Sequence, residues 1–230
     1  VFSHFYSSNK KYPLNKFLRN LVSKICLKIY SLSDILLAQS ISYKKELKKN
    51  LNNKEIKLVF NTIDDKNLFF ENKKKLRLNR SNLKIVSAGN FSTTIPYDTF
   101  IGAISYLKKK YSNKIVWNFY GNGTKFKYFE NLVIKNKCQD IVKLHGKVEQ
   151  EELPEIMKQN DLFLLGLINE KLVSRTCPSR LIYAMANAMP IIACAHGEIS
   201  KILDNADCGL VSRPDSVEGL VKNIIKFKNM

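Results

Sequence analysis

From Leu83 to the end of the chain, short apolar segments alternate with longer segments of helical periodicity. The apolar segments have the length and composition of buried β-strands, and the segments between them place apolar residues on one helical face. Parallel strands joined by helices require right-handed crossovers, which give a sheet covered on both faces. We therefore predict an α/β fold with a doubly wound, Rossmann-like parallel sheet. The predicted strands are 84–88, 114–120, 141–145, 161–166, 190–194 and 209–212, and the predicted helices are 97–109, 124–136, 149–158, 179–188, 199–205 and 216–227.

Residues 1–72 form a predicted partial α/β domain, and the charged segment 73–82 is the predicted linker to a second domain, 83–230. Apolar residues from Leu14 to Ile29 recur at helical spacing. This helix has a basic face, and it either packs on a neighbouring sheet, the commoner use of such helices, or contacts lipid. A short apolar run at 35–38, a polar helix at 42–50 and a strand at 56–60 follow. The basic residues of the first helix are Lys16, Arg19, Lys24 and Lys28.

The residue pattern of 175–194 predicts a loop, a helix, a turn and a buried strand, in that order. Pro178 keeps the preceding residue out of the helical region, and Ser179 is the predicted cap of the helix that follows. Pro190 stops that helix before the apolar strand. A helix N-terminus at the carboxyl edge of a parallel sheet favours an anion such as phosphate, and Arg180 in the first turn adds positive charge.

The segments Pro178-Ser179-Arg180-Leu181, Tyr183-Ala184-Met185-Ala186 and Pro190-Ile191-Ile192-Ala193 resemble one family motif. It is the donor-site segment of retaining GT-B glycosyltransferases of the "group 1" (family 4-like) type, which reads P-S-K-L-x-E-Y-M-A-A-G-K-P-V-I-A. The resemblance implies that 83–230 is a nucleotide-sugar-binding GT-B C-terminal domain. It also implies that residues 1 to about 65 correspond to the last third of the N-terminal acceptor domain, so the chain reads as a fragment.

Glycine-containing turns follow the first three predicted strands, and their order matches the family's G-N-L, G-x-G and F-x-G-x-V segments. Ligands of open α/β sheets lie outside the carboxyl ends of the strands, where such turns allow close approach. By resemblance, Glu198 approaches the sugar, although an acid in a first helical turn is equally expected as a cap. The candidate donor-binding residues are Gly89, Asn90, Phe91, Gly121, Asn122, Gly123, His145, Gly146, Lys147, Val148, Pro178, Ser179, Arg180, Tyr183 and Glu198.

The sequence departs from the family pattern at charged positions. Arg175 and Tyr183 stand where the family has two glutamates, and Ala188 replaces its glycine. The loop 92–96 lacks the family's lysine, so the diphosphate charge falls to Arg180, with Lys147 or Arg175 as helpers and the Ser92 and Thr93 hydroxyls as donors. Catalytic residues are not assigned from these motifs.

The net charge of +18 is unusual, and +12 of it lies in residues 1–80. Such a surface favours anionic partners, here an anionic membrane, although lysine enrichment on a solvated surface explains it equally well. No aromatic and basic ladder for nucleic acid is present. The cysteines are widely spaced and odd in number, which indicates reduced thiols in a cytoplasmic protein, without a metal site or disulfide framework.

Two hypotheses follow. In the first, the chain belongs to a glycosyltransferase that moves a sugar from a nucleotide-sugar to a lipid-linked or polysaccharide acceptor at the inner membrane face, without a metal or cofactor. In the second, it is a catalytically inactive GT-B-like binding or partner module, because both family glutamates are replaced.

Overall fold

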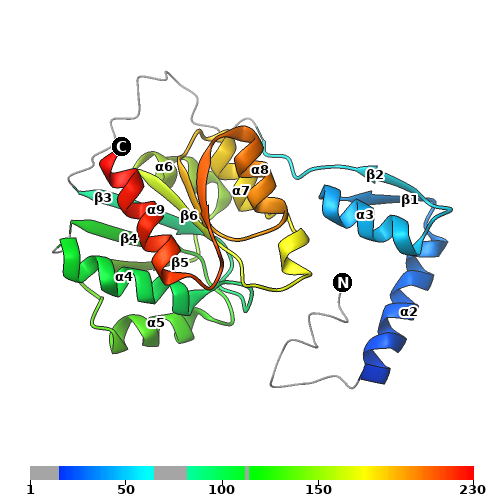
Figure 1. The fold of residues 1–230 in the computed structure, drawn as a ribbon, viewed down its shortest axis with the longest axis horizontal. Helices are drawn as coiled ribbons and strands as arrows, with labels where there is room; N and C mark the ends of the chain where they lie inside the picture. Colours follow the sequence, from blue (N-terminus) through cyan, green and yellow to red (C-terminus); the bar gives the residue numbers. More distant parts are fainter. Residues whose placement is uncertain (1–15, 65–81, 112–113) are drawn as a thin grey trace. The chain divides into compact units, whose positions relative to one another are not determined.

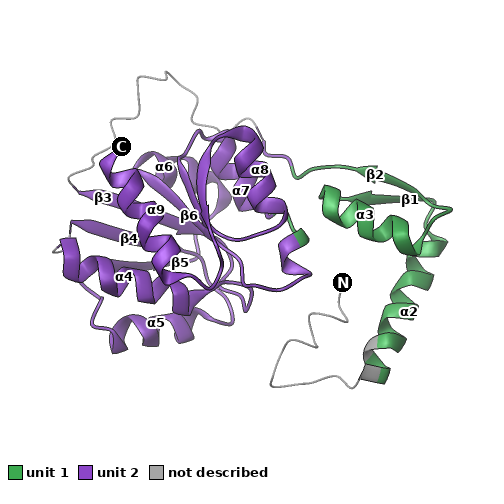
Figure 2. Ribbon diagram, viewed as in Figure 1, with its two compact units in different colours: residues 1–61, 175–177 green, residues 62–174, 178–230 purple. Residues whose placement is uncertain are grey.

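The computed structural model describes residues 16–64, 82–111 and 114–230, without the side chains of Lys16 and Arg19. The chain forms two compact units (Figure 2). The first unit is Val1–Asn61 with Arg175–Cys177, and the second is Thr62–Ser174 with Pro178–Met230. Residues 73–81 of the predicted linker lie outside the described residues, so the domain boundaries at 72 and 83 stay a prediction.

The first unit contains one βαβ element preceded by a helix. Helix α2 (Lys16–Leu32) leads to β1 (Ile35–Ala38), and α3 (Ile41–Asn50) connects β1 to the parallel strand β2 (Glu55–Leu58). The α3 helix begins where the Ser40 hydroxyl accepts a hydrogen bond from the Tyr43 amide at 3.1 Å, as expected of a serine N-cap. The predictions of a helix at 42–50 and a strand at 56–60 are thus correct to within two residues at each end, and the apolar run at 35–38 is strand β1.

The apolar face of α2 is exposed in the described structure. Phe17, Ile25 and Ile29 are each at least half exposed. Packing on a neighbouring sheet and contact with lipid both stay predictions for this helix.

The second unit is built on a parallel sheet of six strands in the order β5-β4-β3-β6-β7-β8 (Figure 1). Strands β6 and β7 are buried along their whole length, whereas β4 alternates buried and partly exposed residues. This is the doubly wound sheet that the alternating pattern predicts. The strands are β3 (Leu83–Ala88), β4 (Ile115–Tyr120), β5 (Val142–Gly146), β6 (Leu162–Gly166), β7 (Ile191–Cys194) and β8 (Gly209–Ser212).

Helices cover both faces of this sheet, and Figure 1 shows α4, α5 and α9 together on one side. The predicted helix at 149–158 is two elements, a short 3-10 helix followed by α6, because Pro154 falls at the start of α6. The helices are α4 (Tyr97–Tyr111), α5 (Phe126–Lys135), η2 (Gln150–Glu152), α6 (Leu153–Lys158), η3 (Val173–Arg175), α7 (Ser179–Ala186), α8 (Glu198–Ala206) and α9 (Val217–Asn229).

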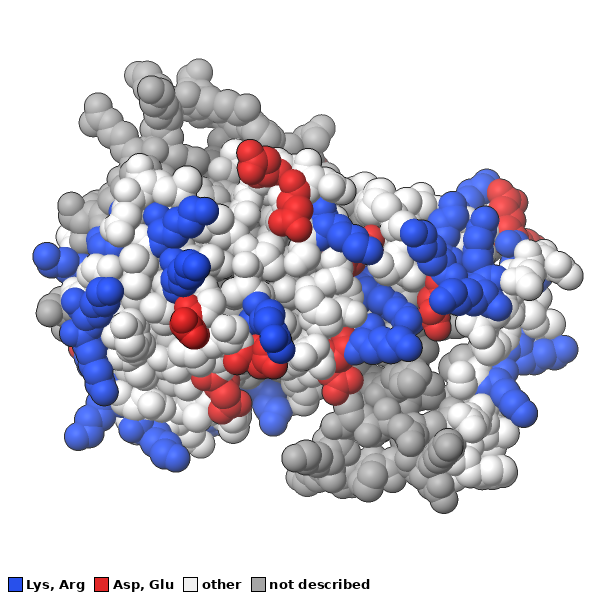
Figure 3. Space-filling view, viewed as in Figure 1, with Lys and Arg blue, Asp and Glu red and all other residues white. Residues whose placement is uncertain are grey.

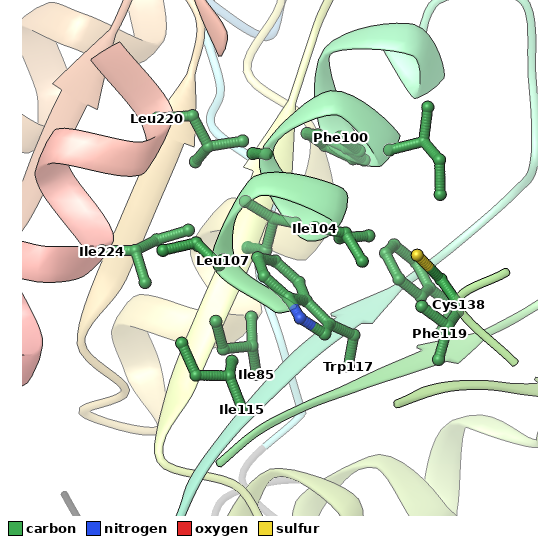
Figure 4. Packing of buried hydrophobic residues seen from close by; sticks show 14 of the residues in the cluster. Ile85, Phe100, Ile104, Leu107, Ile115, Trp117, Phe119, Cys138, Leu220 and Ile224 are labelled. Carbon is green, nitrogen blue, oxygen red and sulfur yellow. The ribbon is translucent and has the colours of Figure 1, made fainter. Parts of the chain in front are cut away.

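The main core lies between the sheet and helices α4, α5 and α9. Trp117 of β4 is fully buried there among Ile85, Leu107 and Ile224 (Figure 4). Truncating a buried aromatic side chain of this kind costs about 3–5 kcal/mol. The apolar residues of the predicted strands and helices therefore hold the sheet and its edges in place.

Helix α7 ends earlier than predicted, at Ala186 instead of residue 188. Ala188 takes a positive φ of 51°, and the Met189 amide then donates to the Ala184 carbonyl at 3.0 Å. This is the hydrogen-bond pattern of a helix that ends in a left-handed residue, a position usually held by glycine. Ala188 therefore performs the turn that the family motif assigns to glycine.

Lysine and arginine side chains are visible over both units, and they gather over α3, where acidic side chains are few (Figure 3). In the described residues, no helix is both long and apolar enough to cross a lipid bilayer.

Candidate functional site

The carboxyl edge of the sheet has a topological switch point between β3 and β6. From β3 the chain proceeds outward to β4 and β5, and from β6 it proceeds in the opposite direction to β7 and β8. Loops on either side of such a point diverge and leave a crevice in which α/β proteins bind ligands. The predicted donor-site turns after β3, β4 and β5 all lie at this edge.

The turns after β3 and β4 pack directly on one another. The Gly89 amide donates to the Tyr120 carbonyl at 3.0 Å, and the Phe91 amide donates to the Asn122 carbonyl at 2.9 Å. A Cβ atom at Gly121 would overlap the Gly89 carbonyl oxygen, and one at Gly123 would overlap the Asn90 side chain. These glycines are thus required by the packing of the two turns, whatever ligand binds.

Phe91 belongs to the core and not to a ligand-facing surface. It is 3% exposed, and its ring centroid lies 5.1 Å from that of Phe126 and 5.8 Å from that of Tyr97. Its neighbours Gly89 and Asn90 are exposed, as is Asn122 in the adjoining turn. The predicted G-N-F segment therefore anchors the turn through Phe91 and leaves Gly89 and Asn90 exposed.

Gly146 differs from the other turn glycines. Its φ is 75°, so a side chain there would be strained, yet a Cβ atom would meet no described residue within 4 Å other than its two chain neighbours. Glycine at this position leaves open space beside the end of β5. The neighbouring Val148 is partly exposed in the following loop.

Arg180 lies at the switch point itself. Its Nη2 donates to the carbonyl of Gly166, the last residue of β6, at 3.1 Å. A Cβ atom on Gly89, just after β3, would lie 3.5 Å from its Nη1. The side chain is half-buried, and burial lowers the pKa of the guanidinium to about 10, an effect that the nearby Tyr97 partly opposes. The group is therefore charged at pH 7, and among the described residues no carboxylate forms an ion pair with it.

The start of α7 differs from the prediction in one respect. Ser179 is the first residue of the helix and is exposed, and Pro178 holds the cap position with no side-chain hydrogen bond. The extended backbone of Pro178 (ψ 140°) already sets the helix start, so the hydroxyl of Ser179 is not needed as a cap.

Tyr183, which replaces a family glutamate, connects α7 to η2. It is 6% exposed, and its hydroxyl donates to the Gln150 carbonyl at 3.4 Å. Burial raises the pKa of the Tyr183 phenol, with smaller contributions from Glu151 and Asp64. Tyr183 thus supplies a structural link where the family has a charged group.

The residues predicted to assist Arg180 in binding the diphosphate mostly have other partners. The exposed Lys147 pairs with Glu149 at 2.7 Å. Within the first unit, Arg175 pairs with Glu46 at 3.2 Å. The Ser92 hydroxyl bonds to that of Thr94 at 2.7 Å, while Thr93 is exposed.

Ile95 and Pro96 are buried in the loop after β3, where the sequence offered no cation. Of the three cations predicted for the site, Arg180 is the one that lies at the switch point and forms no ion pair with a carboxylate of the described residues.

His145 is held by a polar network that strand and helix patterns do not reveal. Its ring stacks on Tyr120, with centroids 4.1 Å apart and an interplanar angle of 5°. Its Nε2 lies 3.0 Å from Asn118 Oδ1, and the Asn118 amide in turn donates to Asn160. Burial, followed by the charge of Lys143, lowers the pKa of His145, which favours the neutral ring. An asparagine inside the predicted apolar strand 114–120 was the one sequence signal of this network.

The loops after β6 and β7 also interlock. A Cβ atom on Gly197 would overlap the Ser174 carbonyl oxygen, so the turn requires glycine. Glu198 follows in the first turn of α8 and is 3% exposed. Across residues 16–64, 82–111 and 114–230, no three His, Cys, Asp or Glu side chains gather as metal ligands.

Comparison with known proteins identifies the family of the chain. Residues 69–230 match the family model described as glycosyl transferases group 1. No protein with a curated description matches the chain.

Solved structures share the fold at low sequence identity. Sucrose-phosphate synthase from Thermosynechococcus elongatus has a TM-score of 0.74 at 16% identity, over 98% of this chain and 56% of its own. A variant of S. aureus TarM in complex with fondaparinux, alpha-GlcNAc-glycerol and UDP has a TM-score of 0.72 at 12% identity, over 97% and 41%. WaaG, a glycosyltransferase involved in lipopolysaccharide biosynthesis, has a TM-score of 0.70 at 17% identity, over 85% and 54%.

The chain therefore spans about half the length of the glycosyltransferases that it matches. Its family match covers most of the sequence and the whole sheet whose edge carries Arg180 and the glycine turns. By sequence and by fold, this chain belongs to the glycosyl transferases of group 1.

Proposed function

We propose that the chain carries the donor-binding domain of a retaining hexosyltransferase. In this proposal the enzyme transfers a sugar from a nucleotide-sugar to a lipid-linked or polysaccharide acceptor during cell-envelope polysaccharide synthesis. The observation that carries the proposal is Arg180, a charged and half-buried side chain at the switch point of the sheet.

Desolvation of the Arg180 guanidinium costs free energy that a hydrogen bond to the neutral Gly166 carbonyl offsets only in part. A diphosphate in the crevice would supply the missing negative charge through charge-assisted hydrogen bonds. Helix α7, eight residues long, begins at the same edge, because Arg180 in its first turn reaches the Gly166 carbonyl. The backbone amides at a helix start favour an anion. Arginine and helix amides together would stabilise the leaving diphosphate, so we expect the reaction to need no metal.

The donor that we favour is a UDP-sugar. Two solved relatives, TarM and Anabaena HepE, are described in complex with UDP, the latter also with glucose. The description of WaaG in lipopolysaccharide biosynthesis supports an envelope acceptor.

We place the protein in the cytoplasm, peripherally at the inner membrane face. Lysines on α2 and α3 would dock on anionic lipid, because each basic residue near such a surface contributes about 1 kcal/mol. Sedimentation with vesicles tests this: binding to anionic vesicles at low salt is expected, and equal binding to neutral vesicles would contradict it.

A second candidate function is an inactive partner module. It is favoured by Tyr183, which uses its hydroxyl in a structural bond to Gln150 where the family has a glutamate. Such a module would bind nucleotide without transferring sugar.

Calorimetry with UDP-, GDP- and ADP-sugars and the free nucleotides tests the proposal. We expect saturable binding of one nucleotide series by the folded protein, and absence of binding to every ligand would overturn it. If binding occurs, a transfer assay with the longer protein that contains this chain separates the enzyme from the inactive module.

A further inference from the structure

A line of hydrogen-bonded side chains starts at Asn160, between α6 and β6, passes through Asn118 of β4 and ends at His145 of β5. Asn160 Nδ2 donates to the Ile156 carbonyl at 2.7 Å, and Asn118 Nδ2 donates to Asn160 Oδ1 at 2.8 Å. Asn118 Oδ1 then lies 3.0 Å from His145 Nε2. We refer to Asn160, Asn118 and His145 as the amide relay.

The polarity of the amide relay is fixed at its inner end. A backbone carbonyl can only accept, so Asn160 must turn its NH₂ group toward Ile156 and its oxygen toward Asn118. Asn118 must then donate to Asn160, which leaves its own oxygen facing His145. His145 Nε2 must therefore carry a hydrogen. Because neutral imidazole has one N–H, Nδ1 is left as a hydrogen-bond acceptor.

The relay is held rigidly, while its outer end is open. Asn160 is only 4% exposed, and the Tyr120 ring, parallel to that of His145, fixes the plane of the imidazole. The His145 side chain is exposed, and within the described residues its Nδ1 has no hydrogen-bond partner. The next residue is Gly146, beside which the structure leaves open space.

We propose that the amide relay makes His145 a specificity-determining residue, whose Nδ1 accepts a hydrogen bond from a ring N–H of the nucleobase bound beside Gly146. Uracil and guanine carry such an N–H, whereas cytosine and adenine present an unprotonated ring nitrogen at the equivalent edge. The inference rests on the proposed function and adds to it the chemical class of the base.

Nucleotide preference tests the proposal with two probes of nearly equal shape. UDP offers a ring N–H where CDP offers a lone pair, which would face the lone pair of Nδ1. We expect calorimetry at pH 7.5 to show UDP binding about 10-fold or more tightly than CDP. His145→Phe keeps a ring to stack on Tyr120 but has no acceptor, so the preference should fall to about twofold or less. His196→Phe, at the chain's other described histidine, should leave it unchanged.

The tautomer of His145 is measured separately, by ¹⁵N NMR of the protein without nucleotide. We expect hydrogen on Nε2 in the wild type and a mixture of tautomers in Asn118→Ala, in which the relay is broken. Hydrogen on Nδ1 in the wild type would overturn the proposal, as would an undiminished preference for UDP in a folded His145→Phe variant. If no nucleotide binds the wild type, the proposed function fails as well, and the tautomer alone then reports whether the relay exists.

Discussion

Replacing Gly121 or Gly146 with alanine adds the same methyl group at two turns with different surroundings. At Gly121 the new Cβ would overlap the Gly89 carbonyl oxygen, and the backbone has a φ of 129°. Strained backbone costs about 1–3 kcal/mol and overpacking about as much again, so Gly121→Ala should lose about 2–6 kcal/mol of stability. At Gly146 the methyl meets none of the described residues beyond its chain neighbours, and only the left-handed backbone costs about 1–2 kcal/mol.

In Gly146→Ala, ligand binding should suffer more than stability. The methyl group of Gly146→Ala enters the open space where we place the nucleobase, so UDP affinity should fall about tenfold although most stability is kept. Urea unfolding measures stability, and calorimetric titration with UDP measures affinity. Equal losses of stability in the two variants would refute the packing argument. An unchanged UDP affinity in Gly146→Ala would refute the placement of the ligand.

Three further predictions concern other residues. Ala188→Gly should raise the free energy of unfolding by about 0.5–1 kcal/mol, because glycine adopts the φ of 51° without strain, and an unchanged urea midpoint would contradict this. Arg180→Ala should lower UDP affinity about 10- to 100-fold with little change in Tm, whereas a lower Tm with full affinity would assign Arg180 a purely structural role. An NMR titration of His145 should give a midpoint below 6.5, and Lys143→Gln should raise it. The pKa of His145 is lower in the folded protein than in the unfolded protein, so the contribution of His145 to the free energy of unfolding is fully present above about pH 6.5. This contribution is lost as the pH falls through the pKa of the folded protein. A titration midpoint at or above 6.5 would contradict this prediction.

The sheet could be predicted from the sequence because its strands carry a local signal. Strands such as β6 and β7 are apolar at every position, since both of their faces are covered, and glycine or proline marks the turns around them. The glycine turns at the carboxyl edge followed from the same pattern, because parallel strands bring their ends together.

The directions of the site side chains could not be predicted in this way. Arg180 bonds to a carbonyl 14 residues earlier, and the relay joins His145 to Asn118, 27 residues away. Neither contact has a periodic signal in the sequence. The left-handed backbone conformation of Ala188 was not predicted for another reason, because alanine favours continuation of a helix. The pair of Lys147 and Glu149, two residues apart, was within reach of sequence reasoning.

The central claim is that a nucleotide diphosphate binds at the carboxyl edge, between the glycine turns and Arg180. The nine glycines of the chain allow a direct test, because ¹⁵N-glycine labelling gives one amide signal for each. Gly89 and Gly146 lie at the proposed site, whereas Gly102 is in α4, Gly209 begins β8 and Gly219 is in α9. On titration with UDP, we predict shifts of the first two signals and constant positions for the other three. Saturable shifts confined to Gly102, Gly209 and Gly219 would contradict the account.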